Sequence, residues 1–159
     1  MPPAGLIDTG AILAILEADD YWHLACLEAL ASVQIPLFTS EAVLTEVFHL
    51  AGKNPYNAEK VWRFVRSGAV ELKPLDEQDL PDLHALIAQY KDRPMNFADA
   101  TLVHLAARES LSLILTVDFA DFETYRIGGR KRFTILPNRQ RRSTGKGSLM
   151  RAQQQCPCE

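Results

Sequence analysis

Four acidic residues occupy positions from which their carboxylates can meet. Asp8 directly follows an apolar run typical of a short buried strand, and Asp118 follows residues 113–117, the clearest strand pattern of the chain. Ligands of parallel α/β folds bind at the carboxyl ends of the strands, so both acids belong to the predicted binding edge. Either could instead simply cap the helix that follows it.

Two further acids lie on the apolar faces of predicted helices. Glu46 shares the inward stripe of a helix ending near residue 52 with Val43, Val47 and Leu50. Asp99 shares the stripe of the helix predicted for residues 97–108 with Leu102, Val103 and Ala106. An ionised carboxylate on such a stripe is costly unless it is paired or bound to a metal. Residues 1–125 are poor in cations, and no Lys or Arg has an obvious claim on these sites.

The chemistry predicted for the four carboxylates is metal binding. Two unit charges about 4 Å apart at an effective dielectric near 20 repel by roughly 4 kcal/mol. A cluster of four therefore needs protons or a divalent cation, and oxygen ligands without His or Cys favour Mg²⁺ or Mn²⁺. Such an ion activates a water and steadies a leaving oxygen, so the natural substrate is a phosphodiester.

Two neighbours of Asp118 are open to more than one interpretation. Thr116 could hold a ligand carboxylate or a metal-bound water, or it could simply suit a strand as a β-branched residue. Asp121 could be an outer ligand or a helix cap.

Strand and helix patterns alternate along the chain. Strands are predicted at residues 6–7, 35–38, 69–72, 113–117 and 133–136, the last as an edge strand. Helices are predicted for residues 11–18, 21–31, 41–52, 56–66, 77–90 and 97–108, the third, fifth and sixth capped by Ser40, Asp76 and Asn96. The alternation predicts an α/β fold with a mostly parallel, twisted sheet of four to five strands and helices on both faces.

The net charge of −3 hides an asymmetry. Residues 1–125 carry 8 Lys and Arg against 19 Asp and Glu, whereas residues 126–159 carry 9 against 1. This pattern suits a protein that binds metal in one place and phosphate in another, although a solvated basic tail would give it too. We divide the chain into a folded domain, residues 1–137, and a basic tail, residues 138–159, predicted to be disordered.

Other bulk features exclude several protein classes. No apolar run approaches the roughly 18 residues that span a bilayer, and no signal-peptide pattern is present, so a cytoplasmic location is expected. The three cysteines lack zinc-ligand spacing, and Cys26 is interpreted as a small buried hydrophobe. Trp22 and Trp62 are interpreted as packing anchors, of which at least one could line a partner surface.

The sequence around the four acids resembles a known family. The similar stretches are Leu-Ile-Asp8-Thr-Gly-Ala, Thr-Ser-Glu-Ala-Val-Leu-Thr-Glu46-Val, Asn-Phe-Ala-Asp99-Ala and Leu-Thr-Val-Asp118-Phe-Ala-Asp121-Phe. They look like the four acidic blocks of PIN-domain nucleases. Their order and spacing resemble those of the toxin ribonucleases of VapBC toxin–antitoxin pairs, and the likeness runs from about residue 6 to residue 137.

The resemblance implies a PIN-like fold and a metal-dependent endoribonuclease that hydrolyses RNA. It implies that Mg²⁺ or Mn²⁺ is held by the quartet Asp8, Glu46, Asp99 and Asp118. It implies Thr116 and Asp121 as supporting residues. It also implies a homodimer and a small antitoxin protein that blocks the site.

An acidic pocket repels the RNA backbone, so nearby cations must hold the phosphates. The first candidates follow the Asp118 block and are Arg126, Arg130, Lys131 and Arg132. Further candidates are Arg93 and, in the tail, Arg139, Arg141, Arg142 and Lys146. Tyr125 or Phe119 could stack on a base, although buried aromatic residues are more common.

Three other functions fit parts of the pattern. An RNA-processing PIN nuclease would act without an antitoxin. A catalytically silent PIN-like module would only bind a partner, but the presence of all four acids argues against lost catalysis. An aspartyl-phosphate phosphohydrolase would use Asp8 as its nucleophile, but the second aspartate usual two residues later is replaced by Gly10.

Overall fold

A computed structural model describes residues 4–139 of the 159-residue chain. Five parallel strands form one sheet in the order β3-β2-β1-β4-β5. They are β1 (Gly5–Ile7), β2 (Leu37–Thr39), β3 (Val70–Leu72), β4 (Leu113–Leu115) and β5 (Thr134–Leu136). The predicted α/β class with a parallel sheet is confirmed, and β5 lies at an edge as expected. The predicted tail falls almost entirely on residues 140–159, outside the described part.

Helices fill the connections between the strands. They are α1 (Thr9–Leu16), α2 (His23–Ala31), α3 (Glu41–Ala51), α4 (Pro55–Arg66), α5 (Leu80–Gln89), α6 (Phe97–Arg108) and α7 (Phe119–Thr124). The predicted fifth helix starts as a 3₁₀ turn, Glu77–Asp79, before it continues as α5. The helix α7 is not among the predicted helices, because its 6 residues are too few to show a helical period.

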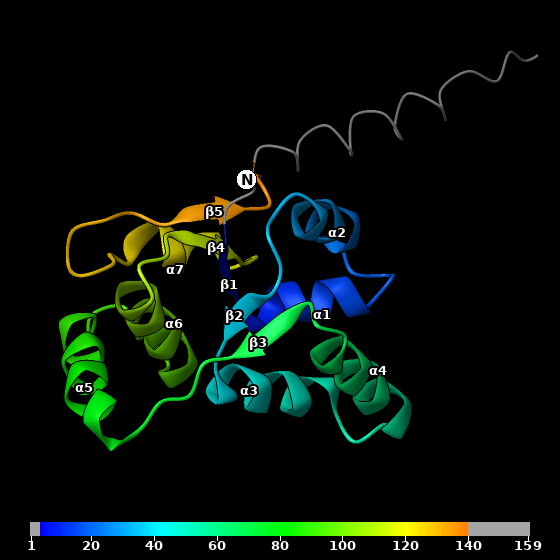
Figure 1. Cartoon of the computed structure of the whole chain (residues 1–159), viewed down its shortest axis with the longest axis horizontal. Helices are drawn as coiled ribbons and strands as arrows, with labels where there is room; N and C mark the ends of the chain where they lie inside the picture. Colours follow the sequence, from blue (N-terminus) through cyan, green and yellow to red (C-terminus); the bar gives the residue numbers. More distant parts are fainter. Residues whose placement is uncertain (1–3, 140–159) are drawn as a thin grey trace, which may run out of the picture.

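The helices cover both faces of the sheet. Figure 1 shows the sheet running from β5 to β3, with α5 and α6 on one side and α1, α2 and α4 on the other. The helix α3 packs against α1, α4 and α6, so it joins the two helical layers. No helix within residues 4–139 has the length and apolar character needed to cross a membrane.

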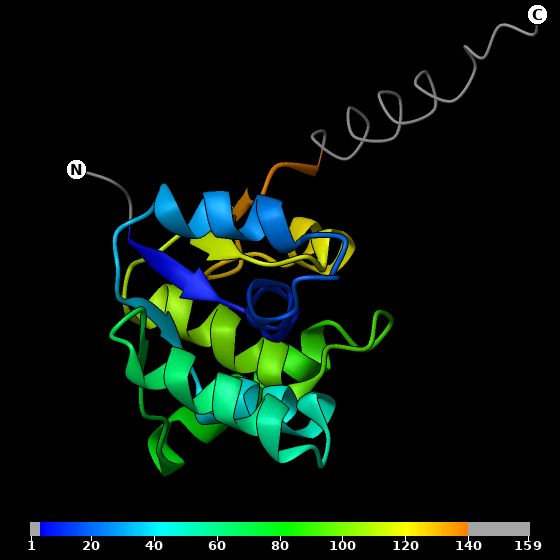
Figure 2. The same ribbon diagram turned by 90° about the vertical axis from the view of Figure 1, so that its right-hand side faces the viewer.

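The central pair of strands, β1 and β4, is packed closely. A Cβ atom on Gly5 would lie 2.7 Å from the carbonyl oxygen of Leu113, so only glycine fits there. Every residue of both strands is buried, as expected of a strand covered on both faces. Figure 2 shows β1, in dark blue, ending directly at the first turn of α1.

The register of this pair positions the candidate site. Ile7 pairs with Leu115, and the next residue, Asp8, donates its backbone N–H to the carbonyl oxygen of Leu115 at 2.9 Å. Asp8 and Thr116 are therefore neighbours at the carboxyl edge of the sheet. Sequence reasoning places both residues at strand ends, but it cannot show that the two strands are adjacent.

Candidate active site

Thr116 ties two of the acidic segments together at the ends of β1 and β4. Its hydroxyl donates to Oδ2 of Asp8 at 3.0 Å and accepts from the backbone N–H of Asp118, also at 3.0 Å. The other carboxylate oxygen of Asp8 accepts from the backbone N–H of Thr9 at 2.7 Å, so Asp8 also caps α1. Of the two interpretations of Thr116, the structure matches the one in which its hydroxyl holds a carboxylate.

Asp99 enters the site from the first turn of α6. Asn96 caps this helix by accepting from the backbone N–H of Asp99 at 2.7 Å. The carboxyl group of Asp99 is only 5% exposed, and its Oδ2 accepts a hydrogen bond of 3.0 Å from the hydroxyl of Tyr125. The suggestion that Tyr125 or Phe119 stacks on a base is wrong, because both rings are buried.

The four predicted acids line one open pocket. Its volume is about 350 Å³, and its walls are Asp8, Thr9, Gly10, Glu46, Leu50, Asn96, Asp99, Val117 and Asp118. The structure thus brings together residues from β1, α3, α6 and the end of β4. Leu50 was predicted to face the core, but its side chain is 57% exposed at the rim of the pocket. The side of α3 that packs on the core carries Val43, Val47 and Ala51, and Leu50 lies beside this stripe.

Burial and mutual repulsion raise the pKa of three of these carboxyls. Burial raises the pKa of Asp8 to about 6, opposed by its hydrogen bonds from Thr9 and Thr116 and assisted by the charges of Glu46 and Asp118. Burial and the charge of Asp8 raise the pKa of Asp99 to about 7, against the hydrogen bond from Tyr125. Burial and the charge of Asp121 raise the pKa of Asp118. The pocket therefore disfavours its own full ionisation in the absence of a cation.

Asp118 and Asp121 share a cationic neighbour. The guanidinium of Arg93 lies 3.9 Å from Oδ1 of Asp121, and its charge partly offsets the rise in the pKa of Asp118. The expectation that no Arg or Lys pairs with Glu46 or Asp99 is confirmed for the described residues, and the cation of this corner lies beside Asp118 and Asp121 instead. Asp121 itself lies beside the pocket rather than in its wall. Within residues 4–139, no ion pair includes Asp8 or Asp99.

The oxygen-rich wall fits a hard divalent cation in its chemistry. The side chains within residues 4–139 form no ready-made group of three metal ligands. Asp8 and Asp99 each accept a hydrogen bond from a neighbouring hydroxyl. Thr9 is one of the residues that line the pocket, and its hydroxyl is the buried side-chain oxygen of the described chain that lacks a hydrogen-bond partner. An unsatisfied buried hydroxyl beside carboxylates indicates a site built for a polar ligand.

Comparison with known proteins identifies the fold and the family. The sequence model of the PIN domain matches residues 5–127. The chain belongs to the PIN-domain family. Ribonuclease VapC26 of Mycobacterium tuberculosis (strain ATCC 25618 / H37Rv) is 34% identical over 134 residues, which cover 83% of this chain and 99% of VapC26.

Solved structures of PIN-domain toxins share the fold. The crystal structure of VapC20 of Mycobacterium tuberculosis, a sarcin–ricin loop cleaving toxin, has a TM-score of 0.66 at 20% identity and covers 74% of this chain and 94% of its own. DNA-bound VapBC2 of Rickettsia felis gives 0.60 at 16% identity, with 83% and 98% covered. DNA-bound VapBC of Salmonella typhimurium gives 0.59 at 18% identity, with 84% and 98% covered.

The predicted RNA-binding cations of this PIN domain differ in their surroundings. None of them is among the described residues that line the acidic pocket. The guanidinium groups of Arg93 and Arg126 are engaged with backbone carbonyls of the α7 segment. The side chains of Arg130, Lys131 and Arg132 are exposed. Arg139 pairs with Glu123 at 3.7 Å, and Arg141, Arg142 and Lys146 lie outside the described residues.

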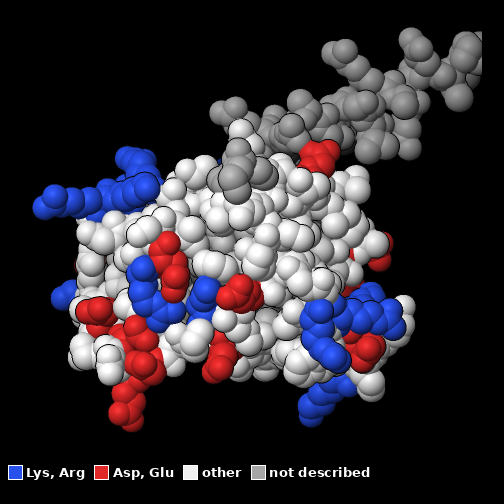
Figure 3. Space-filling model, in the orientation of Figure 1, with Lys and Arg blue, Asp and Glu red and all other residues white. Residues whose placement is uncertain are grey.

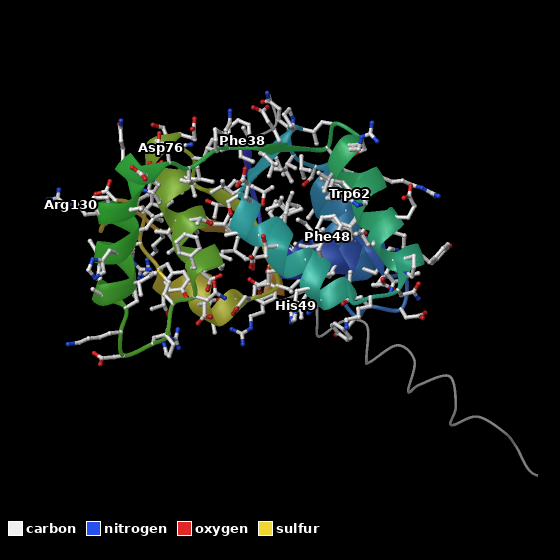
Figure 4. All side chains as sticks on the ribbon, turned by 90° about the horizontal axis from the view of Figure 1, so that it is seen from below. Phe38, Phe48, His49, Trp62, Asp76 and Arg130 are labelled. Carbon is white, nitrogen blue, oxygen red and sulfur yellow. The ribbon has the colours of Figure 1, made fainter. Side chains whose placement is uncertain are left out.

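The two tryptophans and Cys26 differ in how they are packed. Trp22 is a packing residue, with its ring 5.1 Å from that of Phe119. Trp62 is 51% exposed and stacks at 4.8 Å on Phe48, between α3 and α4 (Figure 4). Cys26 is buried as predicted, and burial raises the pKa of its thiol to about 12. Trp62 is therefore the tryptophan with area left to contact a partner.

Proposed function

We propose that this PIN-domain protein is a metal-dependent endoribonuclease and the toxin of a toxin–antitoxin pair. The observation that carries the proposal is the convergence of Asp8, Glu46, Asp99 and Asp118 on one pocket. Four ionised carboxylates without a cation would be unfavourable there, since burial and mutual repulsion raise the pKa of Asp8 and Asp99. The 34% identity to a ribonuclease over nearly its whole length supports the same activity.

The four carboxylates would hold Mg²⁺ or Mn²⁺. The ion, when bound, supplies a water of lowered pKa and neutralises charge on a phosphate. Thr116 orients Asp8 and Tyr125 orients Asp99, because each donates a hydrogen bond of 3.0 Å to one carboxylate oxygen. Both donors favour the ionised form that a metal ligand requires. Asp121 supports Asp118 as an outer acid rather than a wall of the pocket.

The surroundings of the pocket suit an RNA strand. Glu46 and Asn96 also line a neighbouring hollow of about 620 Å³, which is large enough for a nucleotide. A substrate phosphate at the acidic pocket would be placed next to the ion, while the adjoining nucleotide occupies the neighbouring hollow.

The partners follow from the relatives. Two of the similar structures are VapBC complexes bound to DNA, which supports a small antitoxin protein as the partner of this chain. The half-exposed Trp62 and Phe48 pair gives apolar area for that partner or for a homodimer. We propose a cytoplasmic site of action, where RNA is found, and we keep residues 138–159 as a basic tail outside the PIN domain.

The decisive experiment is cleavage of a labelled single-stranded RNA by the purified chain. We expect cleavage with Mg²⁺ or Mn²⁺ and none with EDTA. Asp8→Asn and Asp99→Asn should each lower the rate by at least about 100-fold, since even outer partners of a metal site are worth 10–100-fold. Glu59→Gln, an exposed acid on α4, is the matched control and should cleave like the parent.

Two results would contradict the proposal. The first is cleavage that survives EDTA and both aspartate variants. The second is a protein that binds neither RNA nor metal. The toxin assignment has its own test, which is growth arrest on expression of the chain, relieved by co-expression of the adjacent short reading frame. Cleavage without arrest or relief would favour an RNA-processing nuclease.

A further inference from the structure

The loop between α7 and β5, residues 126–133, contains four of the predicted RNA-binding cations, and they are not equivalent. Arg126 braces the loop. Its guanidinium donates to three successive carbonyl oxygens at the end of α7, those of Glu123, Thr124 and Tyr125, at 2.8, 2.9 and 3.0 Å. Its backbone N–H donates to the hydroxyl of Tyr90 at 2.9 Å. Arg126 is therefore occupied within the fold.

The tip of the loop is a fixed turn. The backbone N–H of Ile127 donates to the carbonyl oxygen of Lys131 at 2.8 Å, and the N–H of Lys131 donates back to Ile127 at 3.1 Å. Gly128 and Gly129 have φ angles of +58° and +79°, which glycine adopts without strain. Ile127 and Phe133 are buried on either side of the tip. The charged residues between them are held in place by the backbone rather than trailing from it.

Three consecutive cations, Arg130, Lys131 and Arg132, project from this turn. All three are exposed, and none takes part in an ion pair among residues 4–139. A group of Lys and Arg side chains stands out at the upper left of Figure 3, where Figure 1 draws the loop. Figure 4 shows Arg130 at the margin of the molecule beside α5. Like charges fixed side by side without counter-charges match a polyanion.

Tyr125 links this loop to the acidic pocket. The hydroxyl of Tyr125 donates to Asp99, and the next residue is Arg126, whose guanidinium stabilises the start of the loop. The basic tip and the pocket are thus held by the same buried anchor. The acidic body, with 19 Asp and Glu against 8 Lys and Arg in residues 1–125, repels an RNA backbone. A substrate therefore needs an attractive contact that lies outside the pocket.

We propose that Arg130, Lys131 and Arg132 form a docking site for the phosphates of single-stranded RNA, separate from the acidic pocket. This inference rests on the proposed ribonuclease function. The three cations hold the substrate by its backbone and so favour RNA long enough to reach both sites. Cations that contact phosphates release counter-ions, so the docking contribution falls as salt rises.

The test compares two triple variants with equal changes of charge. One is Arg130→Ala, Lys131→Ala and Arg132→Ala. The control is Lys53→Ala, Arg63→Ala and Arg66→Ala, three exposed cations near or on α4. Both are made in the Asp8→Asn background and titrated with a labelled single-stranded RNA at several salt concentrations. Thermal unfolding confirms that each variant is folded.

We expect the loop variant to bind RNA at least about 10-fold more weakly than the Asp8→Asn parent. The slope of log K against log salt should shrink by roughly 2, at about 0.7 for each phosphate contact on a single strand. The control should change affinity by less than about 3-fold near 0.15 M salt, where charges beyond about 8 Å are screened. In the Asp8 background, the loop variant should raise KM for RNA cleavage and leave kcat nearly unchanged.

Two results would overturn the docking site. They are equal losses of RNA affinity for both triple variants and no loss for the loop variant. If the parent with Asp8 cleaves RNA and the loop variant cleaves it with the same KM, the docking site alone is wrong. If that parent neither cleaves nor binds RNA, the proposed function itself is wrong.

Discussion

The hydroxyl of Tyr125 donates a 3.0 Å hydrogen bond to Oδ2 of Asp99, which joins the end of α7 to the acidic pocket. Both side chains are buried, and the ring of Tyr125 is held edge-on by Tyr90 and Phe122. The bond opposes the burial and repulsion that raise the pKa of Asp99 to about 7. Tyr125 is therefore a positioning residue for the carboxylate rather than a surface for a base.

Tyr125→Phe should leave the ring packing intact and raise the pKa of Asp99 further. We expect weaker Mn²⁺ binding and a rate profile whose acidic limb moves to higher pH, because a metal must displace a more tightly held proton. Stability should fall by about 1–3 kcal/mol, the range for a hydrogen bond to a charged group and its loss. Calorimetric Mn²⁺ titration and a pH–rate profile measure both effects.

The matched control is Tyr90→Phe. The hydroxyl of Tyr90 accepts from the backbone N–H of Arg126. The variant therefore loses a hydrogen bond of the same aromatic cluster and leaves the contacts of Asp99 unchanged. It should lose stability but keep the pH profile of the parent. An unchanged profile in Tyr125→Phe would show that the hydrogen bond does not tune Asp99.

The metal-free protein should lose stability as the pH rises from about 4 to about 7. The pKa of Asp8 is raised from 3.8 to about 6 and that of Asp99 to about 7, so the folded state keeps protons that the unfolded state has released. The stabilisation from these protons is complete below pH 4 and disappears as the pH passes through the folded-state values. For Asp8 alone the shift corresponds to about 3 kcal/mol.

Chemical unfolding in EDTA at a series of pH values measures this dependence. Asp8→Asn should flatten the curve relative to the parent, because the amide has no proton to lose. Mn²⁺ should restore stability to the parent at neutral pH, with an apparent affinity that rises through pH 6–7. If Asp8→Asn and the parent show parallel curves, Asp8 does not titrate in this range.

Thr9→Val should change the stability of the fold and the binding of a ligand in opposite directions. Its buried hydroxyl has no partner in the described chain, so Thr9→Val should keep or raise the stability of the metal-free protein by up to about 1 kcal/mol. The same change should weaken binding of Mn²⁺ or of RNA phosphate, and Thr9→Ser should preserve it. Unfolding and Mn²⁺ titration measure the two quantities.

Thr116→Val is the contrasting variant. It removes a hydroxyl that is bonded to both Asp8 and the backbone of Asp118, so it should destabilise the fold by about 1–3 kcal/mol. Equal stability losses in Thr9→Val and Thr116→Val would mean that the Thr9 hydroxyl already has a partner. Unchanged binding of Mn²⁺ and of RNA in Thr9→Val would show that the Thr9 hydroxyl does not contribute to the site.

The acidic quartet could be predicted because each member breaks a local pattern. Asp99 interrupts a buried helical stripe, and Asp8 and Asp118 end strand patterns, so the anomaly is visible over a few residues. Leu50 misled the same reasoning, since it lies beside the stripe of Val43, Val47 and Ala51 that packs on the core. Local periodicity describes a helix but not the extent of the surface that covers it.

The contacts that tune the acids could not be predicted, because they join residues far apart in the sequence. Tyr125 lies 26 positions from Asp99, and Thr116 lies 108 positions from Asp8. A tyrosine next to a basic run is more often buried than stacked on RNA, but only the packing around it decides between the two. Parallel strand order and the short α7 depend on the same tertiary arrangement.

Arg93 is the cation of the described chain that lies at the acidic corner, and its removal should weaken metal binding. Its guanidinium donates to the carbonyl oxygen of Ala120 at 2.8 Å and to the hydroxyl of Thr124, and its charge partly offsets the rise in the pKa of Asp118. Arg93→Gln should remove the hydrogen bonds that hold α7 in place next to Asp118, and Mn²⁺ affinity should therefore fall by about 2–5-fold, while the pKa of Asp118 rises. The loss should be greater at low pH than at high pH, because protons compete with the metal for the raised-pKa carboxyl of Asp118. Arg93→Lys should keep most of the affinity, and Lys91→Gln, an exposed neighbour, serves as the control for net charge. Tighter Mn²⁺ binding in Arg93→Gln would instead show that Arg93 competes with the metal for the carboxylates.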